Sequence, residues 1–115
     1  MDKDTRRIIE TIYHGEDEGI RYALPIPTTW ASGPTNPVLT VKNAAGTDVT
    51  ATTTEGTTTV SGQTITLARI TGTGFRTRNE LSAGGIAAGA KYRIEVRFNS
   101  GDDELEAFGD LIGQE

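Results

Sequence analysis

The segment from Lys91 to Phe98 constrains the fold of this 115-residue chain more than any other feature. A strict period of two places all apolar side chains of a strand on one face and all charged ones on the other. This pattern predicts an antiparallel strand with one buried face and one face in water. The apolar residues of the segment are Tyr92, Ile94, Val96 and Phe98, and the charged residues between them are Arg93, Glu95 and Arg97.

A turn signal and a second strand follow this segment. Residues 99–103 read Asn-Ser-Gly-Asp-Asp, a composition typical of a tight connection. The next strand is expected from Glu104 to about Ile112, so the two strands form a C-terminal β-hairpin. The alternation changes phase at Phe108 and Gly109, which predicts a β-bulge near Gly109.

Short alternating segments separated by turn residues recur along the whole chain. About seven or eight such strands, spaced by roughly 8–12 residues, are typical of an antiparallel β-sandwich of the immunoglobulin-like or fibronectin type III-like kind. We therefore predict an all-β fold, with residues 1–13 as an N-terminal arm or edge strand and residues 14–115 as one sandwich domain. The expected strands are residues 7–13, 20–24, 37–42, 49–53, 57–60, 64–70, 91–98 and 104–112.

Two stretches do not fit the strand pattern. Residues 14–19 read His-Gly-Glu-Asp-Glu-Gly, which predicts a polar turn exposed to water. Residues 72–89 are rich in glycine and mixed in charge, and we expect a loop there with one short helical turn near residues 78–81.

Composition excludes several classes of protein. The chain has no cysteine, which rules out a disulfide framework, a thiolate zinc site and a cysteine nucleophile. Its formal net charge of −5 opposes nucleic-acid binding, which needs a basic face toward the phosphates. The longest apolar stretches are a few residues, too short to span a bilayer, and no signal peptide is expected.

The sequence contains no recognisable set of catalytic residues. The single histidine, His14, lies beside Glu16, Asp17 and Glu18, but this spacing matches no known metal site. Nor does a nucleophile motif accompany it. A second acidic cluster at residues 102–106 lacks the spacing of a calcium loop and is expected to be a charged hairpin tip, although cation binding there stays open. We predict that the chain is not an enzyme and has no catalytic, cofactor-binding or metal site.

Apolar residues outside the alternating strands are the candidates for contacts with other proteins. The N-terminal arm carries more of them than a free tail needs, and aromatic and Arg side chains dominate interface hot spots. Trp30 either caps the core or lies half exposed at a contact surface. Phe75 either anchors the 72–89 loop in a neighbouring subunit or folds onto its own core. The candidate contacts are Ile8, Ile9, Ile12, Trp30, Phe75, Arg76 and Arg78.

Residues 86–96, Ile-Ala-Ala-Gly-Ala-Lys-Tyr-Arg-Ile-Glu-Val, resemble the tyrosine corner of fibronectin type III domains. In such a corner a short Gly-containing turn leads through a tyrosine into an alternating strand. The resemblance implies that the ring of Tyr92 packs at the edge of the sandwich. It also implies that the Tyr92 hydroxyl bonds to main chain a few residues upstream. The alternative is that Tyr92 is one more aromatic residue of the core.

The wider pattern resembles a group of short structural proteins of tailed bacteriophages. The resemblance rests on a Gly-Glu turn at residues 15–16, a Pro/Trp segment at 20–30, a Pro-Val-Leu-Thr-Val-Lys strand with its turn at 37–50, and the closing hairpin at 92–112. The chain departs from that pattern at residues 72–85, which are longer than a plain hairpin connection. The resemblance implies a virion protein, made in the bacterial host cytoplasm and assembled into the particle.

Within that class the resemblance favours a capsid decoration, or cement, protein. Such a protein binds the major capsid protein, and we expect a homo-oligomer that uses strand edges, the N-terminal arm and loops. A neck, head-tail connector or baseplate component is the nearest alternative. A carbohydrate-binding or adhesion module is a further one, but it needs exposed aromatic residues, which make up only 6% of the chain.

Overall fold

The computed structural model describes residues 8–77, 80–81 and 85–115. Strands arranged in several antiparallel sheets make up most of this part of the chain, which confirms the predicted all-β class. Its one helix is α1 (Thr50–Thr53), a single turn of four residues.

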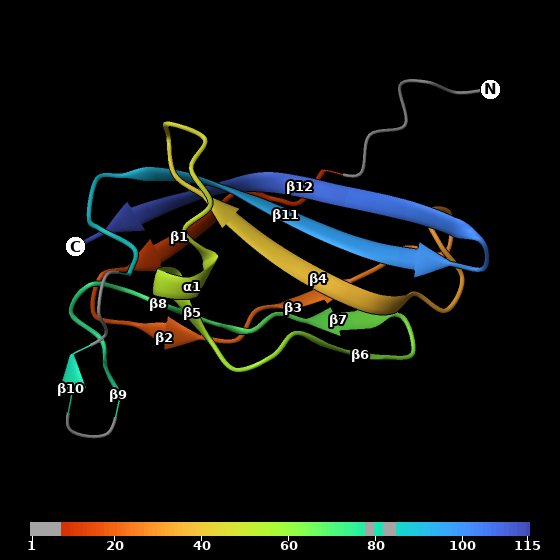
Figure 1. The fold of residues 1–115 in the computed structure, drawn as a ribbon, viewed down its shortest axis with the longest axis horizontal. Helices are drawn as coiled ribbons and strands as arrows, with labels where there is room; N and C mark the ends of the chain where they lie inside the picture. Colours follow the sequence, from red (N-terminus) through yellow and green to blue (C-terminus); the bar gives the residue numbers. More distant parts are fainter. Residues whose placement is uncertain (1–7, 78–79, 82–84) are drawn as a thin grey trace.

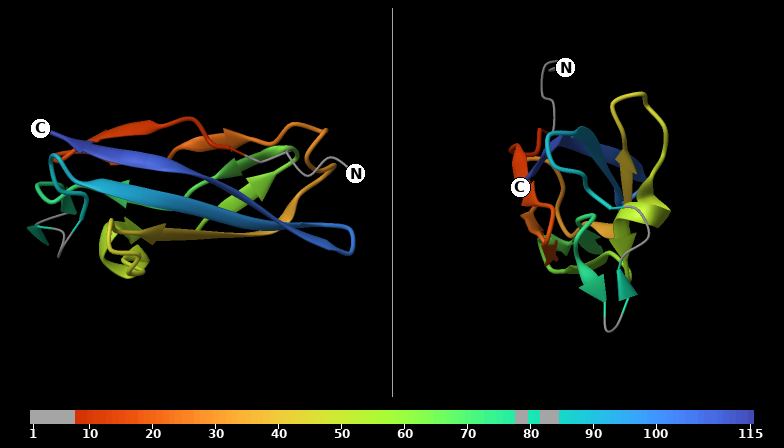
Figure 2. Two further views of the ribbon diagram at one scale, coloured as in Figure 1. Left: turned by 90° about the horizontal axis from the view of Figure 1, so that it is seen from above. Right: turned by 90° about the vertical axis from the view of Figure 1, so that its left-hand side faces the viewer.

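The largest sheet contains the predicted C-terminal hairpin. The two strands of this hairpin, β11 (Lys91–Ser100) and β12 (Asp103–Gln114), form the middle of the sheet. The outer strands are β4 (Thr35–Lys42), antiparallel to β11, and β1 (Ile12–Gly15), parallel to β12. Figure 2 shows β1 along one side of the molecule and β4 along the other. The boundary that we predicted between residues 13 and 14 thus falls inside an edge strand.

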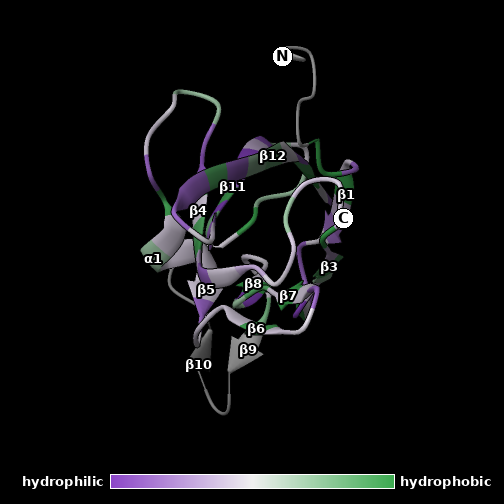
Figure 3. Ribbon diagram, turned by 90° about the vertical axis from the view of Figure 1, so that its right-hand side faces the viewer, coloured by the Kyte–Doolittle hydropathy of each residue, from purple (hydrophilic) through white to green (hydrophobic). Residues whose placement is uncertain are grey.

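Two small three-stranded sheets face the large one (Figures 1 and 3). Their strand orders are β2-β8-β5 and β3-β7-β6, and a separate two-stranded ribbon is formed by β9 and β10. The bounds are β2 (Gly19–Ile20), β3 (Ala23–Pro25), β5 (Thr54–Glu55), β6 (Thr59–Ser61), β7 (Thr64–Thr66), β8 (Arg69–Thr71), β9 (Arg76–Thr77) and β10 (Glu80–Leu81).

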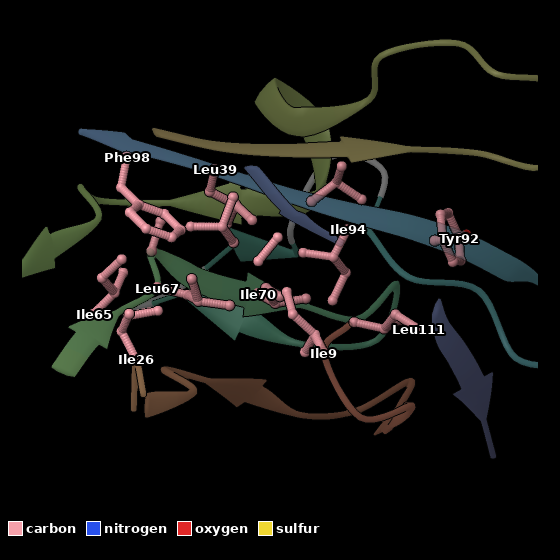
Figure 4. Packing of buried hydrophobic residues seen from close by; sticks show 14 of the residues in the cluster. Ile9, Ile26, Leu39, Ile65, Leu67, Ile70, Tyr92, Ile94, Phe98 and Leu111 are labelled. Atoms are coloured by element: carbon pink, nitrogen blue, oxygen red, sulfur yellow. The ribbon is translucent and has the colours of Figure 1, made fainter. Parts of the chain in front are cut away.

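The hydrophobic core fills the space between the large sheet and the two small ones (Figure 4). The inward face of β11 is buried as the alternation predicts, with Ile94 and Val96 fully buried. Ile65 and Ile70 come from the opposite sheets. Because strands of both layers contribute, neither layer could keep its apolar face out of water alone.

The main-chain hydrogen bond that the resemblance implies for the Tyr92 hydroxyl is present. The hydroxyl of Tyr92 accepts a hydrogen bond from the main-chain N–H of Ala87 at 3.0 Å, five residues upstream. The side chain of Tyr92 is buried, so this bond satisfies a polar group that would otherwise be costly to exclude from water.

The bulge predicted near Gly109 is wrong. The register between β11 and β12 is unbroken from Lys91 to Ser100, so the strand continues straight through this glycine. The irregularity lies instead in the neighbouring N-terminal segment. Ile8 bridges Phe108, and Ile12 pairs with Leu111. The N-terminal segment thus advances four residues between these two pairs, whereas β12 advances three. The N-terminal segment therefore holds one extra residue.

Gly109 has a packing reason to be glycine. A Cβ atom there would lie 2.5 Å from the carbonyl oxygen of Ile9, so only glycine lets the N-terminal segment approach β12 this closely. The change of hydropathy at Phe108 and Gly109 marks this close approach and not a bulge.

Residues 50–53 form helix α1, although a strand was predicted at 49–53. The turn is held by local hydrogen bonds from side chains to main chain. Asp48 Oδ1 accepts the Thr50 N–H at 2.9 Å. The Thr53 hydroxyl donates to the Val49 carbonyl at 2.8 Å, and that of Thr54 to the Thr50 carbonyl at the same distance. The hydroxyl groups of these β-branched residues thus stabilise a helical turn in place of a ladder.

The described residues form twelve strands, more than the predicted seven or eight, because two predicted strands are divided and because β9 and β10 form where a loop was predicted. Residues 20–24 divide into β2 and β3, and residues 64–70 divide into β7 and β8, as the chain passes from one small sheet to the other. The helical turn predicted near residues 78–81 is wrong for residues 80–81, which form β10 and pair with β9.

Candidate interaction site

An apolar groove of about 520 Å³ runs between the N-terminal segment and β3. It lies where an edge of the large sheet meets an edge of a small one. Glu10 is the only charged residue among those that line it, so the groove suits an apolar partner. We call it the edge groove; its lining is Ile8, Ile9, Glu10, Thr11, Ile12, Tyr22, Ala23, Leu24, Pro25, Pro27, Trp30 and Leu67.

Four of the predicted contact residues meet at the edge groove: Ile8, Ile9, Ile12 and Trp30. Their burial separates their roles. Ile9 is 8% exposed and belongs to the core, whereas Ile8 is 60% exposed. Ile12 and Trp30 are partly buried and pack against the core, so Trp30 covers the core and keeps part of its side chain exposed.

Gln63 positions the segment that carries Trp30. Its amide nitrogen donates to the carbonyl oxygens of Ile26 at 2.8 Å and Ala31 at 2.9 Å. Its amide oxygen accepts the N–H of Gly33. One side chain thus satisfies three main-chain groups of a connecting segment, which fixes the wall of the groove. The sequence offered no sign of this role, since Gln63 was expected only to be a turn residue.

The Gln63→Glu variant should therefore loosen the Trp30 segment. A carboxylate keeps the shape of the amide but cannot donate, so two main-chain carbonyls would face a negative charge. We expect a loss of about 2–3 kcal/mol in unfolding free energy. We also expect a red-shifted emission maximum from Trp30, the only tryptophan of the chain. Gln114→Glu, at an exposed position, is the matched control, and equal effects of the two changes would contradict the role of Gln63.

His14 is fully buried, so the prediction of an exposed turn at this residue is wrong. It lies on the inward face of β1 and points toward the second layer. Its Nε2 atom is 2.9 Å from the carbonyl oxygen of Glu18, and its Nδ1 atom is 2.5 Å from the hydroxyl of Tyr22. A carbonyl oxygen only accepts, so Nε2 carries the proton and Nδ1 accepts from Tyr22. His14 therefore joins the edge strand to the β1–β2 turn and to the second layer.

Burial favours the neutral forms of both His14 and Tyr22. Desolvation lowers the pKa of His14, although the Glu18 carbonyl and the Glu18 carboxylate both oppose the shift. Burial, followed by the charge of Glu18, raises the pKa of Tyr22 to about 12, so its hydroxyl stays a donor. The cluster holds two ionisable groups, but it is closed by its own hydrogen bonds, which indicates a structural role.

The outer face of the large sheet has a second apolar surface beside β1. Tyr13 is 59% exposed and pairs with Ile112, and Ile8 pairs with Phe108, so all four side chains share one face. The guanidinium of Arg93 lies over the ring of Phe108, 4.4 Å from its centroid. The edge strand thus presents apolar side chains on both of its faces.

The remaining candidate contacts lie elsewhere. The ring of Phe75 lies against Gly19, where a Cβ atom would be 2.5 Å from a ring carbon, so Phe75 folds onto its own chain. Arg76 belongs to β9, and Arg78 falls outside the described residues. Phe75 is not among the residues that line the edge groove.

Among the residues described, no group of three or more His, Cys, Asp or Glu side chains is placed to hold a metal ion. Within the same ranges, no helix is long and apolar enough to cross a membrane. No protein-family model, curated protein or solved structure matches the chain.

Proposed function

We propose that this chain is a structural protein of a tailed-bacteriophage virion, most specifically a capsid decoration protein. In this role its edge groove receives an apolar segment of the major capsid protein. The observation that supports the proposal is the groove itself, whose lining brings together Ile12 of the N-terminal segment and Trp30 of the segment that follows β3. A groove with a single charged residue in its lining is suited to binding an apolar segment.

The proposal includes a finer assignment of the fold. We infer an immunoglobulin-like or fibronectin type III-like sandwich, in which the four-stranded sheet is one layer and the two small sheets are the other. The hydrogen bond from Ala87 to the Tyr92 hydroxyl supports this assignment. The parallel pairing of β1 with β12 at the edge is the feature that a plain antiparallel sandwich would not have.

Locating the chain in virions tests this function. Antibody-labelled chain should map to the capsid surface in intact particles. Label only at the tail or the portal would replace decoration with the neck, head-tail connector or baseplate alternative. Absence from purified virions would contradict the virion role altogether.

Binding to stripped capsids tests the groove. Trp30→Ala removes a large apolar surface from the groove, and aromatic anchors of this kind dominate binding energy. We expect at least a tenfold weaker rebinding to capsids that have lost the protein. Val38→Ala is the control, because Val38 is 53% exposed on the opposite edge of the same sheet. Equal rebinding of the two variants would contradict docking in the groove.

A further inference from the structure

The two edges of the large sheet are protected differently. On β4, the N–H of Val41 donates to the Thr50 hydroxyl at 2.8 Å and its carbonyl accepts from Val49 N–H at 2.7 Å. Pro37, on the same strand, has no N–H to offer. Proteins block exposed edges in these ways because an open edge pairs with another chain. The β4 edge is thus closed at Val41 and lacks a donor at Pro37.

Among the residues that the structure describes, no strand pairs with the outer side of the segment from Ile8 to Tyr13, so the β1 edge is open there. The amides of Ile9 and Glu16 donate to β12 at 2.7 Å each, to the carbonyls of Phe108 and Gln114. Successive main-chain groups of a strand point to opposite sides, so those of Ile8 and Tyr13 point away from β12. At Gly15 the edge is closed, since its N–H donates to the Glu18 carboxylate at 2.8 Å.

The extra residue in the N-terminal segment makes this open edge self-complementary. In a regular strand, residues five apart lie on opposite faces. Here the irregularity between Ile8 and Tyr13 puts both side chains on the outer face and both sets of main-chain groups on the open side. When two such edges run antiparallel, Ile8 of one copy can pair with Tyr13 of the other copy.

We propose that a second copy of this chain pairs with this edge in antiparallel register, about a two-fold axis between Glu10 and Thr11. Ile8 then lies opposite Tyr13 of the partner subunit, and the symmetry repeats the pair. Aromatic and β-branched residues are favourable cross-strand partners. The two large sheets become one continuous sheet without an open β1 edge.

The proposed register avoids directly opposed like charges at this edge. The chain carries a net charge of −5, so most pairs of like surfaces repel. In the proposed register Glu10, the only charged side chain that lines the groove, faces Thr11 of the partner subunit and not its own counterpart. Like charges directly opposite each other would destabilise the pair.

The dimer extends the proposed function but does not require it. A two-fold axis perpendicular to the sheet keeps both second layers on the same side. The two edge grooves would then flank the axis and form one longer apolar surface. The mass of the chain in solution tests the dimer, and the location of the chain in virions tests the proposed function. Either proposal can therefore fail while the other holds.

Sedimentation of the purified full chain tests the dimer. The unchanged chain should have twice the chain mass at micromolar concentration, and Tyr13→Lys should raise the dissociation constant at least tenfold. Val38→Lys, an equally polar change at a similarly exposed site on the β4 edge, should leave it unchanged. Circular dichroism should show that both variants remain folded. A monomer up to millimolar concentration, a trimer, or equal effects of the two variants would overturn the proposal.

Mixed disulfide trapping tests the register, because the chain has no cysteine of its own. Opposite residues of a hydrogen-bonded antiparallel pair lie about 5.5 Å apart between Cα atoms, within disulfide range. Ile8→Cys and Tyr13→Cys chains should therefore cross-link rapidly when mixed under oxidation, and each alone at least tenfold more slowly. Equal cross-linking of single variants and mixture would overturn this register.

Discussion

Replacing His14 with leucine should remove about 2–4 kcal/mol of unfolding free energy, measured by urea denaturation at pH 7. Leucine fills much of the space of the imidazole but makes no hydrogen bond. The Tyr22 hydroxyl and the Glu18 carbonyl would both lose their partner at the junction between β1 and the second layer. The double variant His14→Leu with Tyr22→Phe should recover part of the loss, because it also removes the orphaned hydroxyl.

The same residue should make the protein less stable in mild acid. Burial lowers the pKa of His14 below its ordinary 6.5, so the unfolded chain takes up a proton first as the pH falls. Stability is therefore complete above about pH 6.5 and decreases below it, by at most about 1.4 kcal/mol per pH unit, until the pKa of the folded state is passed.

The histidine effect can be separated from that of carboxylates. Hydrogen bonds from Thr50 lower the pKa of Asp48. Burial opposes the shift of Glu95, but hydrogen bonds from Arg93 and Lys42 lower its pKa. Both groups therefore titrate in stronger acid. His14 is the only histidine, so the slope just below pH 6.5 should vanish in His14→Leu. An unchanged slope in that variant would show that another group is responsible.

Gly113→Ala should be among the most damaging small substitutions in the chain. A Cβ atom at Gly113 would lie 1.9 Å from the carbonyl oxygen of Ala87, which is main chain and cannot turn aside. The same contact region is held by main-chain hydrogen bonds from Gly113 to Ala90 and from Gly89 to Gly113, both 2.9 Å. We expect a loss of about 3 kcal/mol, because the loop must move off β12.

Gly89→Ala is the matched control for that steric effect. Gly89 has a positive φ of 78°, but nothing lies within 4 Å of the added Cβ atom. Its replacement should cost only the backbone strain, about 1–2 kcal/mol. The urea midpoints of the two variants separate the effect of a steric clash from that of backbone strain. A loss of unfolding free energy at Gly113 no larger than that at Gly89 would contradict the close approach of the Ala87 carbonyl to Gly113.

The strands that could be predicted are those whose own residues alternate. Strand β11 and the inward positions of β4, Leu39 and Val41, follow from a period of two, because burial of one sheet face selects apolar residues locally. Tight turns could also be predicted from the sequence, because residues such as Asn43 and Gly62 have their own conformational preferences.

Elements that depend on residues distant in the chain could not be predicted from the sequence. Helix α1 was expected to be a strand because threonine is β-branched, and its hydroxyl hydrogen bonds cannot be read from composition. His14 was assigned to a solvated turn because its neighbours are acidic. Its burial depends on Tyr22 and on the parallel pairing of β1 with β12, neither of which leaves a local pattern.

The alternation from Lys91 to Phe98 by itself determined that the chain builds a β-sheet with one buried face, because side-chain direction in a strand follows from residue spacing alone. Only the tertiary structure decided which edge of that sheet stays open and where the edge groove lies. Contacts of Thr50 and Val49 with Val41 close the other edge, and the side chain of Gln63 holds the Trp30 segment that walls the groove. These are relations between separate segments of the chain, and no single stretch of sequence records them.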